Sequence, residues 1–441
     1  MRFATWRSSV GGTWTCLCAM ALLGTLPSAA RAQYVLEDIH NPNRYDPDTL
    51  AVPIAYYSDG FKGALGVAAY TDGLFQRQMD SYIFAIGSSN GSYGAIGGMH
   101  NLQFRPIDRL FLDWELSYIR TNEDENNIDG NRAYLRENAG SNRSDEDDLV
   151  ASPSNDFTGN FTFKYLLPIG NGRDTIIDTY RLNEGLLESG ASGGDGYNPF
   201  RSGRTFLELG PSFEYMDIRS AEAVQHQWDT FGVVASAVYD NSDYDITPQR
   251  GNVTTLSLQR DFGAFGSPNP WTNISADFAQ YISLGRSGLF RQQVLALDCW
   301  TSYTTSWSQS GAPGRVKLSD APPFYAGSTL GGMQRMRGYP EERFHDRAAI
   351  YGCAELRLIP SWNPLGKIAL LKNADIAWLQ VVTFVEVGRV ADEYTYGKLF
   401  HNMKGDGGVG IRVLTGDTLL RIDVAGSNEG IQVWANLAQA F

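Results

Sequence analysis

The 441-residue sequence has no run of about 18 apolar residues after position 32, so helices that span a membrane are not expected. It is also short of positive charge, with 36 Lys and Arg against 49 Asp and Glu. Nucleic-acid binding requires the opposite balance. Helical periodicity is weak, whereas Tyr, Phe, Trp and Gly are abundant in short segments of alternating polarity. These features favour a protein built from β-strands.

The first 32 residues have the three-part layout of a secretory signal peptide. Arg2 and Arg7 precede an apolar run at 16–26, and the segment ends in small residues up to Ala32. We therefore expect a signal peptide at 1–32 and a mature chain that starts at Gln33. Its removal takes away three basic residues and no acidic ones, leaving 33 basic against 49 acidic residues and a formal charge of −16.

Only two cysteines, Cys299 and Cys353, remain after that cleavage. In an oxidising compartment two thiols can pair. Alternation places Cys299 with Leu297 on one face of its segment, and Cys353 with Arg357 on the other face of its own. The sequence therefore predicts two free, separately buried thiols.

Sixteen segments show the alternation of a transmembrane strand, in which apolar residues face lipid and polar residues face the lumen. An even number is required of a single-chain bacterial barrel, whose closure leaves no edge in the lipid. We predict an all-β, transmembrane antiparallel β-barrel of about 16 strands at 50–441, preceded by a short periplasmic segment at 33–49. The expected strands are 50–57, 63–71, 78–88, 93–104, 109–121, 156–168, 203–216, 227–240, 251–263, 271–284, 289–305, 347–360, 378–391, 405–415, 418–426 and 430–441.

With both barrel ends of the chain in the periplasm, the connections alternate between the two sides of the membrane. The expected extracellular connections are 122–155, 307–346 and 392–404, and the expected periplasmic ones include 105–108, 241–250 and 361–377. The connection 169–202 also falls on the periplasmic side, where turns are normally short. It is expected to form a small plug or helix there, or to contain a further hairpin.

Four motifs occur in a fixed order along the second half of the chain. Residues 331–340 read Gly-Gly-Met-Gln-Arg-Met-Arg-Gly-Tyr-Pro, followed by Ala-Glu-Leu-Arg at 354–357 and Phe-Val-Glu-Val-Gly at 384–388. Upstream, Pro-Gln-Arg-Gly at 248–251 opens a strand. Together they resemble the Arg-Gly-Tyr/Phe loop and strand motifs of the BamA/TamA outer-membrane assembly superfamily, the bacterial surface antigen barrels. The usual Asp of the third motif is Glu386 here.

The resemblance implies roles for specific residues. Arg337, with Gly338 and Tyr339, would fold with its loop near 307–346 into the lumen and pair with Glu355 and Glu386, which alternation also points inward. In a hydrated lumen, loss of Arg337 is expected to cost on the order of 1–3 kcal/mol.

Other motif residues have turn, strand or assembly roles by the same resemblance. Pro248 and Gly251 would form a turn, and Phe384 and Gly388 would belong to the motif strand. The terminal Phe441, on one face with Ile431 and Val433, resembles the C-terminal signal for the outer-membrane assembly machinery. By contrast, no partner is assigned to Arg335, two residues before Arg337, and its replacement by alanine is expected to have little effect.

The implied function is non-enzymatic: assistance with insertion or translocation of a protein or lipid at the bacterial outer membrane. Family members that receive clients carry POTRA modules, and 33–49 is too short for one, so a separate periplasmic partner is an open expectation. Outer-membrane lipids and lipopolysaccharide are the other expected partners, and nucleic acid is not. The alternative is a passive pore or surface-structural barrel without assembly activity.

An outer-membrane lipid hydrolase or acyltransferase is a weaker hypothesis, because its only support is the Gly-x-Ser-x-Gly match around Ser192. This match lies in a Gly/Ser run without the preceding core strand that a nucleophile elbow requires. The five histidines show no metal-ligand spacing. The acidic stretch 124–130 resembles a calcium loop only loosely. No catalytic residue, metal or cofactor is therefore expected.

Overall fold

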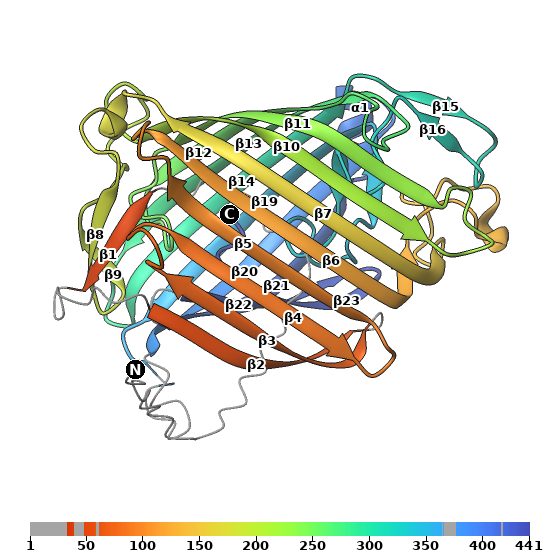
Figure 1. Ribbon diagram of the computed structural model, residues 1–441. Coiled ribbons are helices and arrows are strands. Elements are labelled where there is room, and N and C mark those ends of the chain that lie inside the picture. Colours follow the sequence, from red (N-terminus) through yellow and green to blue (C-terminus); the bar gives the residue numbers. More distant parts are fainter. Residues whose placement is uncertain (1–32, 39–47, 59–60, 364, 366–375, 416–417) are drawn as a thin grey trace, which may run out of the picture.

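The computed structural model describes residues 33–38, 48–58, 61–363, 365, 376–415 and 418–441; the expected signal peptide at 1–32 lies outside this part. Sixteen strands form one sheet in which each strand pairs antiparallel with its neighbour in the chain order, from β2 to β23. Figure 1 shows this sheet curved into a barrel, with the strands tilted along its length. The predicted barrel and its strand number are confirmed.

All sixteen predicted strands are present, with small shifts of their ends. Their bounds are β2 (Asp48–Ser58), β3 (Lys62–Asp72), β4 (Asp80–Ser88), β5 (Tyr93–Gln103), β6 (Leu110–Asn126), β7 (Val150–Leu166), β10 (Arg204–Ile218), β11 (Gln227–Asp240), β12 (Gly251–Asp261), β13 (Trp271–Gly285), β14 (Phe290–Thr304), β19 (Ala348–Pro360), β20 (Ile376–Ala391), β21 (Lys404–Thr415), β22 (Thr418–Ser427) and β23 (Gly430–Leu437).

Two strands are longer than predicted. β6 and β7 each have 17 residues, and their pairing continues to Asn126 opposite Val150. A strand needs only about 9–11 residues to cross the membrane. The extra pairs are formed by polar residues such as Asp124 and Ser152, which carry no apolar alternation, so the sequence pattern could not show them. The connection between these strands is therefore 127–149 rather than 122–155.

The alternation of side chains holds in the folded chain. In β14, Val294, Ala296 and Asp298 are buried on the inner face, while Cys299 lies on the outer face and is exposed. Cys353 is buried, and both thiols are free. The absence of a 299–353 disulfide agrees with the prediction, but the expected burial of Cys299 was wrong. Its neighbour on β19 is Gly352, which has no side chain to cover it.

The two ends of the barrel are built differently. At the right-hand end in Figure 1 lie the hairpin β15 (Ser308–Ser310) and β16 (Lys317–Ser319) and the short helix α1 (Tyr396–Leu399). At the opposite end lie β1 (Tyr34–Asp38), β8 (Asp178–Asn183) and β9 (Leu186–Ser189). We take the first end as extracellular and the second as periplasmic, following the predicted topology. Among the described residues, no helix is both long and apolar enough to cross a membrane.

The connection 169–202 contains a hairpin that stays outside the barrel wall. β8 pairs with β9 and, in parallel, with β1, so that Tyr34 lies opposite Asp178. An apolar cluster of Tyr180, Leu182 and Tyr244 holds this three-stranded sheet against the barrel end. A 3-10 helix, η2 (Gly170–Arg173), precedes it. The hairpin was one of the expected alternatives, but it adds no strand to the barrel.

The last strand is shorter than predicted. β23 ends at Leu437, and the chain then turns at Ala438, whose φ is +145°. Phe441 packs against two clusters of inward side chains, one of which includes Tyr281 and Ala296 on β13 and β14. The terminal aromatic therefore lies inside the barrel, and its expected place on one face with Ile431 was wrong.

The connection before β19 has two parts, and only the second folds inward. Residues 308–312 of the outer hairpin are exposed. Residues 331–346, called the motif loop below, begin after β17 (Ser328–Leu330) and include β18 (Phe344–Asp346). In this loop Met336, Arg337 and Tyr339 are 0% exposed. The inward fold expected for 307–346 thus applies to its C-terminal half.

Candidate functional site

Four consecutive strands supply the charged inner wall that receives the motif loop. Glu355 on β19, Glu386 on β20 and Asp423 on β22 are buried and belong to the inward set of their strands. The pairing places Glu386 opposite Cys353, two residues before Glu355, and Asp423 opposite Gly410 on β21. Alternation points the three carboxylates into the lumen, and the strand register brings them to one patch of the inner wall.

Arg337 joins these three carboxylates. Its Nη1 lies 2.7 Å from Glu355 Oε1 and 3.0 Å from Asp423 Oδ2, and its Nε lies 3.2 Å from Glu386 Oε2. All four side chains are 0% exposed. The backbone N–H of Arg337 also donates to Glu386 Oε2 at 2.7 Å. A planar guanidinium can make several such bonds at once, which a lysine ammonium cannot match.

The guanidinium is also enclosed by aromatic rings. Its carbon lies 3.5 Å from the ring centroid of Phe384, an inward residue of the third motif. Trp434 on β23 donates its indole N–H to the carbonyl oxygen of Arg337 at 2.6 Å. Cation–π contact at a buried site adds to the ionic contacts. Arg337 is therefore bound through its side chain, its N–H and its carbonyl.

Three further arginines balance the acids of the patch. Arg357 lies 2.8 Å from Glu355, and Arg412 contacts Asp423 at 2.5 Å. Arg421 lies 3.4 Å from Asp423 and donates to the carbonyl of Met333 in the motif loop at 2.6 Å. Buried charges are tolerated only when they are paired and hydrogen-bonded. The wall is thus a connected ionic network with Arg337 near its centre.

Gly338 and Tyr339 fix the next part of the motif loop. A Cβ on Gly338 would lie 2.5 Å from Asp406 Cβ and 3.0 Å from the carbonyl carbon of Gly426. Only glycine allows the loop so close to β21 and β22. The Tyr339 hydroxyl donates to Asn428 Oδ1 at 2.8 Å, and its ring stands edge-on to Phe344. Gly388 on β20 likewise leaves room, since a Cβ there would lie 3.0 Å from Met336 Sδ.

The structure therefore brings together Arg337, Gly338, Tyr339, Glu355, Glu386, Phe384 and Gly388. Pro248 and Gly251 lie elsewhere, at the periplasmic turn between β11 and β12. Gly251 has a φ of +95°, and a Cβ there would lie 1.9 Å from Asn241 O, so this turn requires glycine. Phe441 lies near the patch, since its carbonyl accepts from Arg357 Nη2 at 3.0 Å.

Some partners in the site were not singled out from the sequence. Alternation already placed Asp423 inward, but nothing in the sequence paired it with Arg337. The indole of Trp434 was likewise unassigned. Arg335 had been assigned no partner from the sequence; its Nη2 lies 2.8 Å from Asp277 Oδ2, and its guanidinium lies over the ring of Trp300.

The part of the chain that the structure describes contains no group of His, Cys, Asp or Glu suited to hold a metal ion. In the acidic stretch 124–130, Asp124 is bound by Asn126 and Ser154 instead. Ser192 is buried, and its hydroxyl is hydrogen-bonded to the Tyr180 hydroxyl at 2.6 Å and donates to a backbone carbonyl. This serine is therefore placed as a packing residue of the periplasmic sheet.

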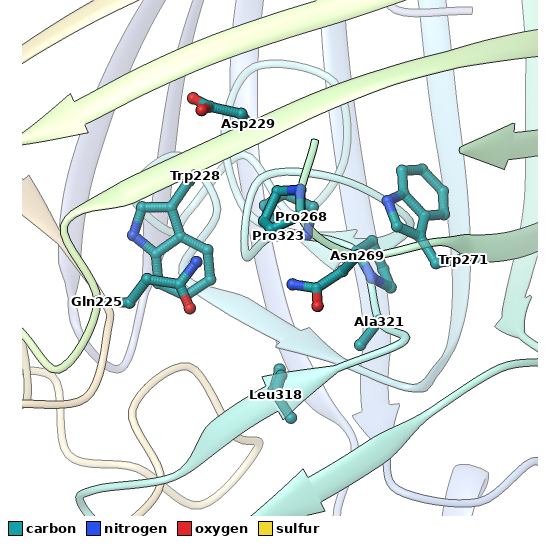
Figure 2. A pocket seen from close by; sticks show the side chains of 10 residues that line it. Gln225, Trp228, Asp229, Pro268, Asn269, Trp271, Leu318, Ala321 and Pro323 are labelled. Carbon is teal, nitrogen blue, oxygen red and sulfur yellow. The ribbon is translucent and has the colours of Figure 1, made fainter. Parts of the chain in front are cut away.

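A small cavity lies among the extracellular loops. Figure 2 shows Trp228 and Trp271 on either side of it, with Asn269, Pro323 and Leu318 between them. Its volume is about 10 Å³, which is room for about one water molecule. This cavity cannot hold a substrate or cofactor.

A model of the Omp85 superfamily domain matches residues 125–432. No curated protein matches the chain. Among solved structures, the chain is similar to BamA from Haemophilus ducreyi lacking POTRA domains 1–3, with 12% identity, a TM-score of 0.47, and coverage of 90% of this chain and 70% of that one. For CdiB from Acinetobacter baumannii the values are 10%, 0.46, 88% and 58%. For CdiB from Escherichia coli they are 11%, 0.50, 88% and 62%.

These structural likenesses concern the fold, and the chain spans less than two thirds of either CdiB chain. The family match extends over well more than half of the sequence and includes β7 to β22 with the motif loop. The resemblance inferred from the four motifs is confirmed. The chain belongs to the Omp85 superfamily.

Proposed function

We propose that this chain assists the insertion or translocation of a polypeptide at the bacterial outer membrane, without catalysing a covalent reaction. The working part in this proposal is the seam between the first strand, β2, and the last, β23. Client strands would pair transiently with an edge at this seam. An edge strand offers a row of backbone donors and acceptors to another chain.

The inward turn of the C-terminal residues is the observation that carries the proposal. β2 has 11 residues, whereas β23 has eight and leaves the wall at Leu437. The four following residues are held inside: Phe441 by Arg357, and Gln439 by Gln380 and Arg412. They therefore do not extend β23 along the wall. In the proposal, the part of β2 that would face them is where a client strand pairs.

The contents of the lumen favour this proposal over the passive pore. The motif loop fills the region beside β19 to β22, and the C-terminal residues lie within the barrel. Extracellular segments also join across the barrel end. Arg343 donates to Ser144 at 2.8 Å and binds Glu429 at 2.7 Å, and Asn142 donates to Asn402 O. These segments lie across the opening that an open channel would need to keep clear.

Reconstitution in lipid vesicles tests the proposal. Vesicles that contain the protein should accelerate folding of an added urea-unfolded outer-membrane barrel, measured as its heat-modifiable form on gels. A photo-crosslinking residue at Thr49 in β2 should capture this client, whereas one at the matched position Thr254, in β12 on the opposite wall, should not. Steady ion conductance without acceleration or capture would favour the pore instead.

Partners follow from the proposal. A client polypeptide and outer-membrane lipids are its direct partners, and a separate periplasmic protein would deliver the client. Phe441 as a signal for the assembly machinery stays a prediction. In the folded barrel it is half-buried, so such a signal would have to be read before the chain folds.

A further inference from the structure

The outward wall of the barrel carries a groove on β11 to β14. Its volume is about 890 Å³, within the range of roughly 300–1,000 Å³ found for ligand sites. Small and large outward residues alternate from strand to strand in the groove. Ala237 on β11 and Ala276 on β13 lie on either side of Leu256 on β12 and pair with it. Leu256 and Ile274 are 56% and 47% exposed. The groove is thus a depression in an apolar face that lipid covers.

The segment after β20 closes one side of this groove. The Tyr394 hydroxyl is 2.7 Å from Thr301 Oγ1, and its ring meets Tyr303 edge-on at 5.7 Å. Farther along, Leu399 of α1 packs against Ala348. Thr301, Tyr303 and Ala348 belong to the outward set of β14 and β19. The segment therefore folds back over the outside of the wall, and the groove has a floor and a side.

Arg347 lies at the loop end of the groove and is held in place. Its Nε donates to Thr304 O at 3.1 Å, its Nη2 donates to Thr305 O at 3.2 Å, and its guanidinium stacks on Tyr303. Among the described residues, Arg347 makes no ion pair. The acidic groove residue Glu393 is paired with Lys398 at 3.4 Å. The Asp346 carboxylate accepts from the backbone N–H of Arg347 at 2.7 Å and attracts its charge. The guanidinium itself is hydrogen-bonded to carbonyl oxygens. A cation fixed in this way at the polar end of an apolar groove suits an anionic headgroup.

The position of the groove in the membrane indicates which class of ligand it can bind. It opens to the hydrocarbon of the membrane, and its charged end lies where the long loops emerge. Exposed aromatic residues gather there, with Tyr396 80% and Phe400 55% exposed and their rings stacked, as at a membrane interface. In the predicted topology this is the leaflet that holds lipopolysaccharide.

We infer that this groove binds an acyl chain of one lipopolysaccharide molecule, whose phosphate pairs with Arg347. The groove spans the eighth to eleventh strands of sixteen, on the wall opposite the seam between β2 and β23. A bound lipid would therefore anchor the side of the barrel that is farthest from the seam. The inference does not depend on the proposed function.

The test measures lipid retained by the barrel purified in mild detergent, as hydroxylated fatty acid and phosphate per protein. Wild type should retain lipopolysaccharide, and Ala237→Phe and Ala276→Phe, which fill the groove, should lose it severalfold. Arg347→Gln should weaken retention as well. The matched control Ala85→Phe, at a lipid-facing alanine on β4 outside the groove, should retain the wild-type amount.

A second measurement guards against misfolding. Each variant is first checked for heat-modified mobility, and lipopolysaccharide is then added to lipid-depleted barrel. It should raise the temperature of heat modification for wild type and Ala85→Phe, but not for Ala276→Phe. Equal retention in all variants, equal loss in the control, or retention of phospholipid or another protein in the groove in place of lipopolysaccharide would overturn the inference.

Discussion

Replacing Arg337 with alanine removes the guanidinium that joins Glu355, Glu386 and Asp423. Glu355 keeps Arg357, and Asp423 keeps Arg412 and Arg421. Glu386 then keeps the hydroxyl of Tyr351, the backbone N–H of residue 337 and a contact with the carboxyl of Asp406, and none of these is a cation. The loss therefore falls mainly on Glu386, whose side chain is fully buried.

The magnitude follows from this burial. Removing one partner of a buried ion pair costs about 3–5 kcal/mol. The sequence led us to expect on the order of 1–3 kcal/mol because a lumen is hydrated, but the side chains of Arg337 and its three acids are 0% exposed. The larger range therefore applies to the free energy of unfolding. Arg337→Lys should lie between wild type and alanine, since a single ammonium cannot span three carboxylates.

Two assays measure the loss. Arg337→Ala should lower the temperature of heat modification and expose residues 331–346 to protease added from outside. Arg335→Ala is not a suitable control, given its contact with Asp277. Arg315→Ala, at an exposed position of the same connection, should change neither readout. Combining Arg337→Ala with Glu386→Gln should recover part of the loss, because the uncompensated charge is removed. Unchanged stability and protease resistance in Arg337→Ala would refute the role of this residue.

Three further predictions use other features. Cys299 should react with a membrane-permeant maleimide in the folded barrel and Cys353 only after denaturation, as mass spectrometry of labelled peptides can show. Gly338→Ala should expose the motif loop to protease, since its Cβ would meet Asp406; resistance equal to wild type would contradict the close approach. Burial, aided by Arg343, lowers the pKa of His345 to about 4 despite its contact with Asn127. The unfolded chain then binds a proton below about pH 6.5 that the folded chain does not bind until about pH 4, so the extracellular contacts should weaken as pH falls between these values. Protease sensitivity of 127–149 at pH 5 and 7.5 tests this, and His345→Asn should reduce the difference.

Sixteen strands could be predicted because each one alternates between two different solvents. Side chains of a barrel strand point alternately to lipid and to the lumen, so apolar and other residues alternate in the sequence. In β21, for example, Val409 and Ile411 alternate with Gly410 and Arg412. This alternation of polarity is absent from the parts of a strand that extend beyond the membrane. The polar extension of β6 and β7 beyond Arg120 was therefore missed, although its pairs continue to Asn126 and Val150.

Pairings between segments far apart in the chain could not be predicted from the sequence. β1 and β8 pair in parallel across more than 140 residues. Neither segment has a local sequence pattern that identifies the other as its partner. The same holds for the turn after Leu437, since the preceding alternation gives no sign that it ends. In the site, the inward position of Glu355 and Glu386 followed from alternation, and their contact with Arg337 followed from the family resemblance. The contacts of Arg335 with Asp277 and of Arg337 with Asp423 depend on the path of the motif loop, which alternation does not describe.

Arg357 links the motif loop to the residues that follow the last strand. It binds Glu355, which binds Arg337, and its Nη2 donates to the carbonyl of Phe441, over whose ring its guanidinium lies at 4.8 Å. Trp434 makes a second connection, from β23 directly to the carbonyl of Arg337. The inner position of the C-terminal residues and the inward fold of the motif loop therefore depend on the same ionic network. On the proposed function, a change in this network would alter the strand that borders the seam, even though Arg337 itself belongs to an extracellular loop.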